Sequence, residues 1–158
     1  MNDLFGQAIS QSYASLAREL AGQHIEALAG YEQAAANLAE ISVPGSSQDA
    51  EAGAARCQLA LNNLQEAQQH AASVWDYLQK QLGAGMEFAI LGYETCADVF
   101  TASGQAALAR QAVEAGYQEL MSRAAKISLP EWRQSFLENV PEHHRLKFRW
   151  QAITDRVY

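Results

Sequence analysis

Apolar residues recur every three or four positions along most of the chain, and short breaks separate these stretches. Val74, Leu78 and Leu82 show the spacing, which places apolar side chains on one face of an α-helix. Pro130 and Pro141 stand where the first turn of a helix tolerates proline. The pattern predicts eight helices, over residues 3–21, 24–41, 48–62, 64–82, 86–103, 105–127, 130–138 and 142–156.

The breaks and the residues that follow them repeat along the chain. Gly22, Asn62 and Gly104 each stand at a turn, and an alanine follows each of them five positions later. Further small or apolar residues come four and then three positions on, which gives the series Ala27, Tyr31, Ala34, then Ala67, Ala71, Val74, then Ala109, Val113, Gly116. The leading alanines are 40 and 42 residues apart. Because small residues let two helices approach closely, we expect these alanines to lie where the helices of a hairpin are nearest.

The helix before each turn places bulky residues beside small ones, as in the segment Tyr93-x2-Cys96-Ala97-x2-Phe100. Together these residues resemble the tetratricopeptide repeat (TPR) over residues 8–127. The form is long and degenerate, and it is similar to the arrays of bacterial signalling and transcription regulators. It departs from the usual period of about 34 residues, and most of the prolines expected between units are missing.

The resemblance implies an all-α fold in which three TPR-like helical hairpins, residues 1–127, form a right-handed superhelix (an α-solenoid). Capping helices over residues 128–158 complete a single domain. An unrelated helical bundle is the alternative, since bundles also join helices by short turns. Repeats of this family are scaffolds, so the implied function is to bind a protein or peptide partner in a concave groove lined by the first helices. A second interpretation is a self-associating or regulatory segment of a bacterial signalling or transcription regulator.

Carried over position by position, the resemblance predicts the residues that line this groove. They are Gln11, Ser15, Arg18, Glu51, Ala55, Gln58, Glu94, Asp98 and Thr101. Because Glu94 and Asp98 are both acidic, we expect an acidic third segment that favours basic or neutral peptides. An ordinary polar surface without a ligand is the alternative interpretation.

Composition restricts the class of protein. Of the 158 residues, 49% are hydrophobic, 18% are charged and 30 are alanine, which favours helices around a packed core. The net charge of −7 leaves too few cations for a nucleic-acid-binding face. No apolar run reaches the roughly 18 residues of a membrane span, and the first residues lack the pattern of a signal peptide. We therefore expect a cytoplasmic protein that contacts neither nucleic acid nor membrane.

Residues that could support chemistry are few. The sequence contains none of the motifs GxGxxG, GxxxxGK[ST], HExxH and GxSxG, so we expect neither an enzyme nor a cofactor. Cys57 and Cys96 have no CxxC spacing and are expected to be small buried side chains. Adjacent His143 and His144 point about 100° apart on a helix, and the other two histidines are single, so we expect no metal site.

The C-terminal segment combines aromatic and basic residues. Four apolar residues fall on one stripe of the last predicted helix: Leu146, Trp150, Ile153 and Val157. This stripe predicts a cap packed against the third hairpin. The alternatives are a homodimer contact through this helix, or a nucleic-acid or membrane contact through its basic residues. For a cap or a dimer, Arg145 and Arg149 are expected to remain in water on the opposite side.

Overall fold

Residues 3–155 are described by the structure, a computed structural model, and over that range the chain forms eight α-helices and no strand. The predicted all-α class is confirmed. The helices are α1 (Leu4–Leu20), α2 (His24–Glu40), α3 (Pro44–Ala60), α4 (Leu64–Gln81), α5 (Ala89–Ala102), α6 (Ala106–Ala125), α7 (Pro130–Glu138) and α8 (Pro141–Thr154). Within the described range, no helix combines the length and the apolar character that crossing a membrane requires.

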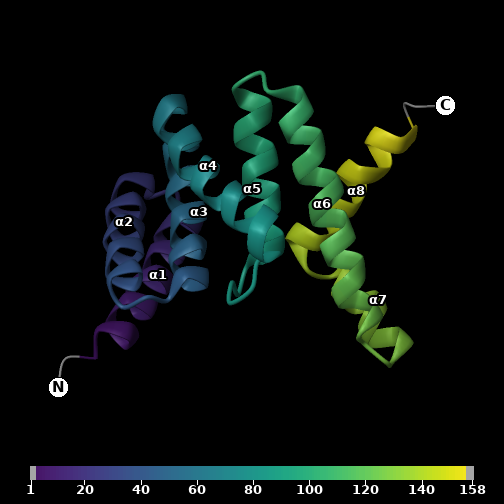
Figure 1. The fold of residues 1–158 in the computed structure, drawn as a ribbon, viewed down its shortest axis with the longest axis horizontal. Helices are drawn as coiled ribbons and strands as arrows, with labels where there is room; N and C mark the ends of the chain where they lie inside the picture. Colours follow the sequence, from purple (N-terminus) through teal and green to yellow (C-terminus); the bar gives the residue numbers. More distant parts are fainter. Residues whose placement is uncertain (1–2, 156–158) are drawn as a thin grey trace.

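Each helix from α1 to α6 packs against the next one in the chain (Figure 1). α1 also contacts α3, and α3 contacts α5, so the first helices of the three hairpins are neighbours. α8 packs on α5 and α6, and α7 contacts α6 and α8. The pairs α1–α2 and α7–α8 lie at opposite ends of the long axis in Figure 1. The chain therefore advances along that axis helix by helix.

Four of the turns share one backbone geometry. The residue with a positive φ, between 58° and 77°, is Gly22, Ser42, Asn62 or Gly104. In each turn the next N–H donates to the carbonyl five residues back, as Asn63 does to Gln58 at 2.9 Å. This bond satisfies a carbonyl that the end of the helix leaves without a partner. Three of the four are the turns at which the sequence predicted a hairpin to reverse, and the fourth joins α2 to α3.

The third helix begins four residues before the predicted start at position 48, and that prediction was wrong. Pro44 occupies the first position of α3, where its missing N–H has no helical partner to lose. The Ser47 hydroxyl, in the same first turn, donates to the carbonyl of Ala35 in α2 at 3.1 Å. A Cβ on Gly45 would lie 2.2 Å from the carbonyl carbon of Gly85. This first turn therefore fits only because position 45 has no side chain.

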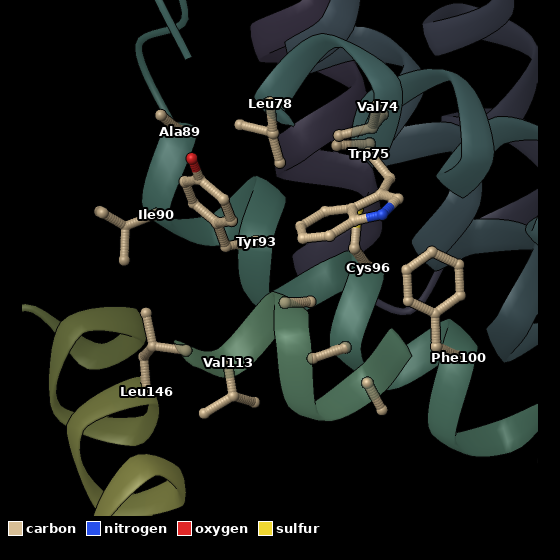
Figure 2. Packing of buried hydrophobic residues seen from close by; sticks show 14 of the residues in the cluster. Val74, Trp75, Leu78, Ala89, Ile90, Tyr93, Cys96, Phe100, Val113 and Leu146 are labelled. Carbon is tan, nitrogen blue, oxygen red and sulfur yellow. The ribbon is translucent and has the colours of Figure 1, made fainter. Parts of the chain in front are cut away.

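The largest cluster of buried side chains joins α4, α5, α6 and α8 (Figure 2). The rings of Tyr93 and Phe100 meet Trp75 edge to face, with centroids 6.4 and 6.1 Å from the Trp75 centroid. Aromatic pairs favour this geometry. Two smaller clusters contain mainly alanine, and Ala27 and Ala67 are completely buried in them. Bulky side chains thus fill the core toward the C-terminus. Toward the N-terminus, small alanine side chains let the helices pack closely together instead.

Both cysteines are buried, as the sequence predicted. Cys57 and Cys96 are free thiols with no exposed area. Burial disfavours the thiolate, which raises the pKa of Cys57 to about 12 and raises the pKa of Cys96 as well. Neither thiol is therefore a nucleophile at neutral pH.

α8 packs against α5 and α6 through part of the apolar stripe. Leu146 is completely buried, and Trp150 stacks on Tyr117 with ring centroids 4.0 Å apart. Ile153 is partly buried against the same cluster. Val157, the last residue of the predicted stripe, lies outside the described residues. These contacts are made within one chain, so the described part of the stripe is not a free surface.

Candidate functional site

The residues predicted to line one groove face different parts of the molecule. Gln11 and Ser15 lie against α2, where a Cβ added to Gly30 would meet both side chains. Glu51 faces α4, and its Oε2 lies 2.6 Å from Nδ1 of His70. All three side chains therefore take part in contacts between neighbouring helices.

Four other residues predicted to line the groove also do not lie on one shared surface. Gln58 is buried, and its Oε1 accepts a hydrogen bond of 2.8 Å from the side chain of Asn63. Ala55 is completely buried in one of the small alanine clusters. The Thr101 hydroxyl donates to a carbonyl one turn back in its own helix at 2.7 Å. Arg18 lies half-buried in the last turn of α1.

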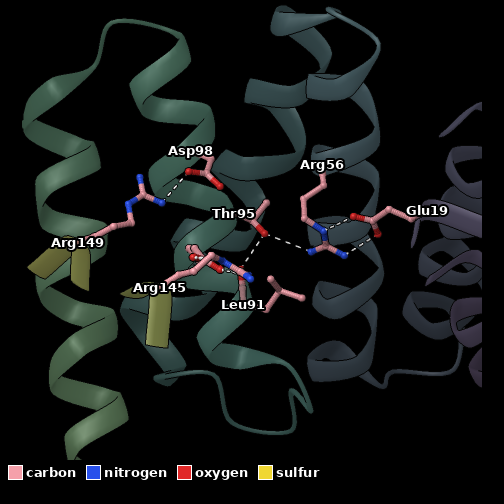
Figure 3. A network of polar contacts seen from close by, with 8 residues as sticks. Glu19, Arg56, Leu91, Thr95, Asp98, Arg145 and Arg149 are labelled. Atoms are coloured by element: carbon pink, nitrogen blue, oxygen red, sulfur yellow. Dashed lines mark hydrogen bonds and ion pairs between the residues drawn. The ribbon is translucent and has the colours of Figure 1, made fainter. Parts of the chain in front are cut away.

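Both acidic residues of α5 form ion pairs with arginines of α8 (Figure 3). Arg145 Nε and Nη2 donate to the two carboxylate oxygens of Glu94 at 2.8 and 2.7 Å. Arg149 Nη1 donates to Asp98 Oδ1 at 2.6 Å. The expectation that both arginines remain in water away from the packed face was therefore wrong. The expected acidic segment is neutralised, because the chain's own helix supplies the opposite charges.

A cleft lies between α1, α3 and α5, where the first helices of the hairpins are neighbours. Apolar side chains line its interior and polar groups lie among them, including Ile9, Tyr13, Leu16, Asp49, Arg56 and Leu91. The enclosed space is about 50 Å³, which is room for a few water molecules. This cleft is the candidate functional site.

A line of polar contacts crosses the same three helices (Figure 3). Arg56 Nε and Nη2 donate to the two carboxylate oxygens of Glu19 at 2.6 and 2.9 Å, and Nη1 donates to the Thr95 hydroxyl at 3.2 Å. The Tyr31 hydroxyl donates to the Glu19 carboxylate at 2.7 Å. The side chains of Arg56 and Glu19 are 20% and 14% exposed. A two-pronged ion pair with this little exposure holds both groups in one geometry.

Asp49 of α3 binds the backbone just before α5. Its carboxylate oxygens accept hydrogen bonds from the N–H groups of Glu87 and Phe88, at 2.7 and 3.1 Å. Both residues are thereby held outside the helix, so α5 begins at Ala89 and not at the predicted position 86. Removal from water raises the pKa of the Asp49 carboxyl to about 6, although the two N–H groups oppose the shift.

Tyr13 of α1 closes one side of the cleft. Its hydroxyl donates to Glu87 Oε2 at 2.5 Å, and its ring meets Phe88 edge to face with centroids 6.4 Å apart. Tyr13 is nevertheless 45% exposed. Because so much of it already contacts water, turning the ring outward opens the cleft at small cost in buried area.

The charges around the cleft are mostly negative. Arg56 is already paired with Glu19, and no cation among residues 3–155 forms an ion pair with Asp49 or Glu87 at the rim. The Ser12 hydroxyl lies buried in the wall and has no hydrogen-bond partner among the residues described. The cleft therefore offers apolar contact, negative charge and one unused hydroxyl group to a ligand.

The predicted groove face differs from the observed cleft face by one residue along the helix. Ser15 and Ala55 were predicted to line the groove, whereas Leu16 and Arg56 line the cleft. One residue corresponds to a rotation of about 100° around the helix axis. One signal in the sequence points to the missed face, because Arg56 is the only lysine or arginine in α2 and α3. A lone cation among alanines requires an acidic partner, and in the structure that partner is Glu19.

Two of the histidines, His70 and His143, make contacts with neighbouring helices or turns. The hydrogen bond to Glu51 raises the pKa of His70, whose Nε2 also lies 3.9 Å from Oε1 of Glu32. His143 Nδ1 donates to the carbonyl of Phe136 at 2.7 Å. Among residues 3–155, no three histidine, cysteine, aspartate or glutamate side chains converge as metal ligands.

No family model matches this chain, and no significant match to it is found among curated proteins or solved structures. What the cleft does is therefore inferred from its own residues.

Proposed function

We propose that this chain is a protein-interaction scaffold, an α-solenoid of three TPR-like hairpins that holds a peptide segment of a partner in the cleft between α1, α3 and α5. The main support is the line Glu19–Arg56–Thr95, which ties together the three helices that form the cleft. A surface whose groups are already held in place loses little conformational entropy when a partner docks. The turn geometry shared by the three hairpins supports the repeat interpretation.

The lining indicates which segments fit. Ile9 and Leu16 offer apolar contact, which favours a segment with at least one apolar side chain. Asp49 and Glu87 keep the rim acidic, which favours basic or neutral segments over acidic ones. The enclosed space of about 50 Å³ holds only a few waters, so Tyr13 turns outward when the segment docks.

A peptide array tests this proposal with the full chain. We expect the chain to select short peptides that combine an apolar residue with a neutral or positive net charge. Ile9→Lys places a cation inside the cleft and is expected to weaken the selected peptides at least about tenfold. Fluorescence anisotropy with labelled peptides measures the affinities, and circular dichroism establishes that the variant keeps its helices.

Ile25→Lys is the matched control, because Ile25 is 69% exposed near the start of α2 and does not line the cleft. It should bind the selected peptides as the parent does. Equal binding by the two variants would contradict the proposal. Selection of acidic peptides alone, or of none, would contradict it too.

A further inference from the structure

The C-terminal helix pair is joined to the rest of the chain by few buried groups. Of the described residues in α8 only His143 and Leu146 are buried, and α7, all of which is described, has no buried residue. Ion pairs and a ring stack provide the other contacts with α5 and α6. The pair between Arg149 and Asp98 is partly exposed, and an exposed ion pair contributes about 0–1 kcal/mol.

The charges of α8 match those of the helix beneath it. Arg145 and Arg149 are one turn apart on α8, and they bind Glu94 and Asp98, which are one turn apart on α5 (Figure 3). Residues at this spacing lie on the same face of a helix. The two helices therefore meet through two stacked pairs of opposite charge.

An apolar residue follows each arginine and packs against α6. Leu146 is completely buried at Gly116, where an added Cβ would lie 2.9 Å from the Leu146 Cδ2 and 2.7 Å from the Cβ of Tyr93. Trp150 stacks on the ring of Tyr117, with the ring planes 6° apart. The segment Arg-Leu-x-x-Arg-Trp thus presents a cation and an apolar side chain twice, one helical turn apart.

We propose that this face of α5 and α6 is a helix-binding site that α8 occupies in the resting chain. The partner that fits it is an amphipathic helix with two arginines four residues apart, each followed by an apolar residue. Such a helix replaces the contacts of α8 one by one, and α8 moves away on α7. This site is distinct from the cleft and does not depend on the function proposed for it.

Glu94 explains why the partner must be basic. Its side chain is 5% exposed, and among the described residues only Arg145 donates hydrogen bonds to its carboxylate. A buried carboxylate without a cation is strongly unfavourable. A neutral or acidic helix leaves that charge unpaired, so the site discriminates against such helices.

The α8 sequence itself is the probe. A fluorescein-labelled peptide of residues 140–155 is titrated with the full-length parent and with full-length Arg145→Glu/Arg149→Glu. In the variant the tethered α8 no longer competes, so we expect the peptide to bind at least about tenfold more tightly than to the parent. Lys147→Glu is the matched control. Lys147 lies 3.8 Å from Glu138 of α7, so this reversal leaves the site occupied and peptide binding as in the parent.

Charge reversal on α5 identifies the site. When Glu94→Arg/Asp98→Arg is added to Arg145→Glu/Arg149→Glu, the chain's own α8 docks again, and the peptide is expected to lose its binding. The proposal is overturned if the parent and the Arg145→Glu/Arg149→Glu variant bind the peptide with equal affinity. It is also overturned if the charge reversal on α5 leaves peptide binding unchanged. Loss of the helical circular dichroism signal in the Arg145→Glu/Arg149→Glu variant overturns it as well, since the site must persist when α8 leaves.

Hydrogen exchange on the unmodified chain provides an independent test. Salt screens the partly exposed ion pair between Arg149 and Asp98, which helps to hold α8 in place. We expect the amides of α8 to exchange faster as sodium chloride is raised, while the amides of α5 and α6 keep their protection. Amides of α8 that exchange only together with those of α5 and α6, at every salt concentration, overturn the proposal.

Discussion

Asp49 caps a helix to which it does not belong: its Oδ1 accepts a hydrogen bond of 3.1 Å from the N–H of Phe88, the residue before α5. Phe88 itself supplies no side-chain cap. A carboxylate is favoured at this place because the first N–H groups of a helix lack partners and the helix dipole is positive there. Through this bond α3 determines where α5 starts, and the same bond shapes one wall of the cleft.

Removing this cap should destabilise the fold. Asp49→Ala leaves two N–H groups without their acceptor, and we expect the free energy of unfolding to fall by about 1–2 kcal/mol. Asp49→Asn keeps one acceptor and is expected to have a smaller effect. Urea denaturation of the three proteins at pH 7 measures the difference. An Asp49→Ala protein as stable as the parent would show that the cap contributes nothing.

The raised pKa of Asp49 predicts a dependence of stability on pH. The folded chain keeps this proton up to a pKa of about 6, whereas the unfolded chain loses it near a pKa of about 4. Between these values the folded state binds more protons, so its stability falls as the pH rises across the window. Subtracting the urea-derived stabilities of Asp49→Asn at each pH isolates this slope. A flat difference between parent and variant from pH 4 to 6 contradicts the raised pKa.

His70 should produce a second slope at higher pH. The hydrogen bond to Glu51 raises the pKa of His70 above its usual value, so the folded chain retains the proton longer than the unfolded one. The resulting stabilisation is complete below about pH 6.5 and disappears as the pH rises through the folded pKa. His70→Gln should remove this slope, and the proton resonances of the His70 ring report its pKa directly. A folded-state pKa at or below the usual value would refute the prediction.

The ion pair between Arg56 and Glu19 should matter more than an exposed pair of the same kind. Arg56→Ala leaves the Glu19 carboxylate, 14% exposed, without its cation, and we expect a loss of about 2–4 kcal/mol. Arg110→Ala breaks an ion pair with Glu114 whose side chains are 54% and 40% exposed, and it should change stability by less than about 1 kcal/mol. Thermal unfolding of both variants tests the ranking, which equal losses would contradict.

Two alanines at matching places in the repeat should respond differently to enlargement. Ala67 is completely buried among Ala55, Ala71 and Val99, so Ala67→Phe overpacks the contact and should cost about 3 kcal/mol. Ala109 is 8% exposed and borders a surface groove, so Ala109→Phe should cost clearly less. Urea midpoints decide the order, and a larger loss for Ala109→Phe would mean that the two hairpins pack differently from this structure.

Helix periodicity was enough to predict the all-α class and to place the breaks at Gly22, Asn62 and Gly104. These signals are local, because a turn with a positive φ restricts residue type at one position. The errors at the starts of α3 and α5 arose from contacts that are distant in sequence. Pro44 is compatible with a loop or with a first helical turn, and only the close approach to Gly85 and the packing of α2 favour the helix.

The height of the polar line along each helix was missed for a geometric reason. Glu19, Arg56 and Thr95 stand three, six and nine residues before the positive-φ residue of their own turns. The polar line therefore moves back by about one helical turn at each hairpin, because neighbouring helices are shifted along their axes. Carrying one set of positions from hairpin to hairpin assumes no such shift. The pairing of Arg145 with Glu94, 51 residues away, likewise has no local signal.

The two buried thiols can report partial opening of this chain. Cys57 lies in the small cluster shared by α2 and α3, and Cys96 lies in the large cluster around Trp75. A thiol reagent modifies each cysteine only while its own cluster is open, and mass spectrometry of the digested protein tells the two apart. The order of labelling thus ranks the hairpins by how readily they open. Because the native thiols stay unreactive in the closed chain, a cysteine added at an exposed position can also be labelled alone, without replacing either of them.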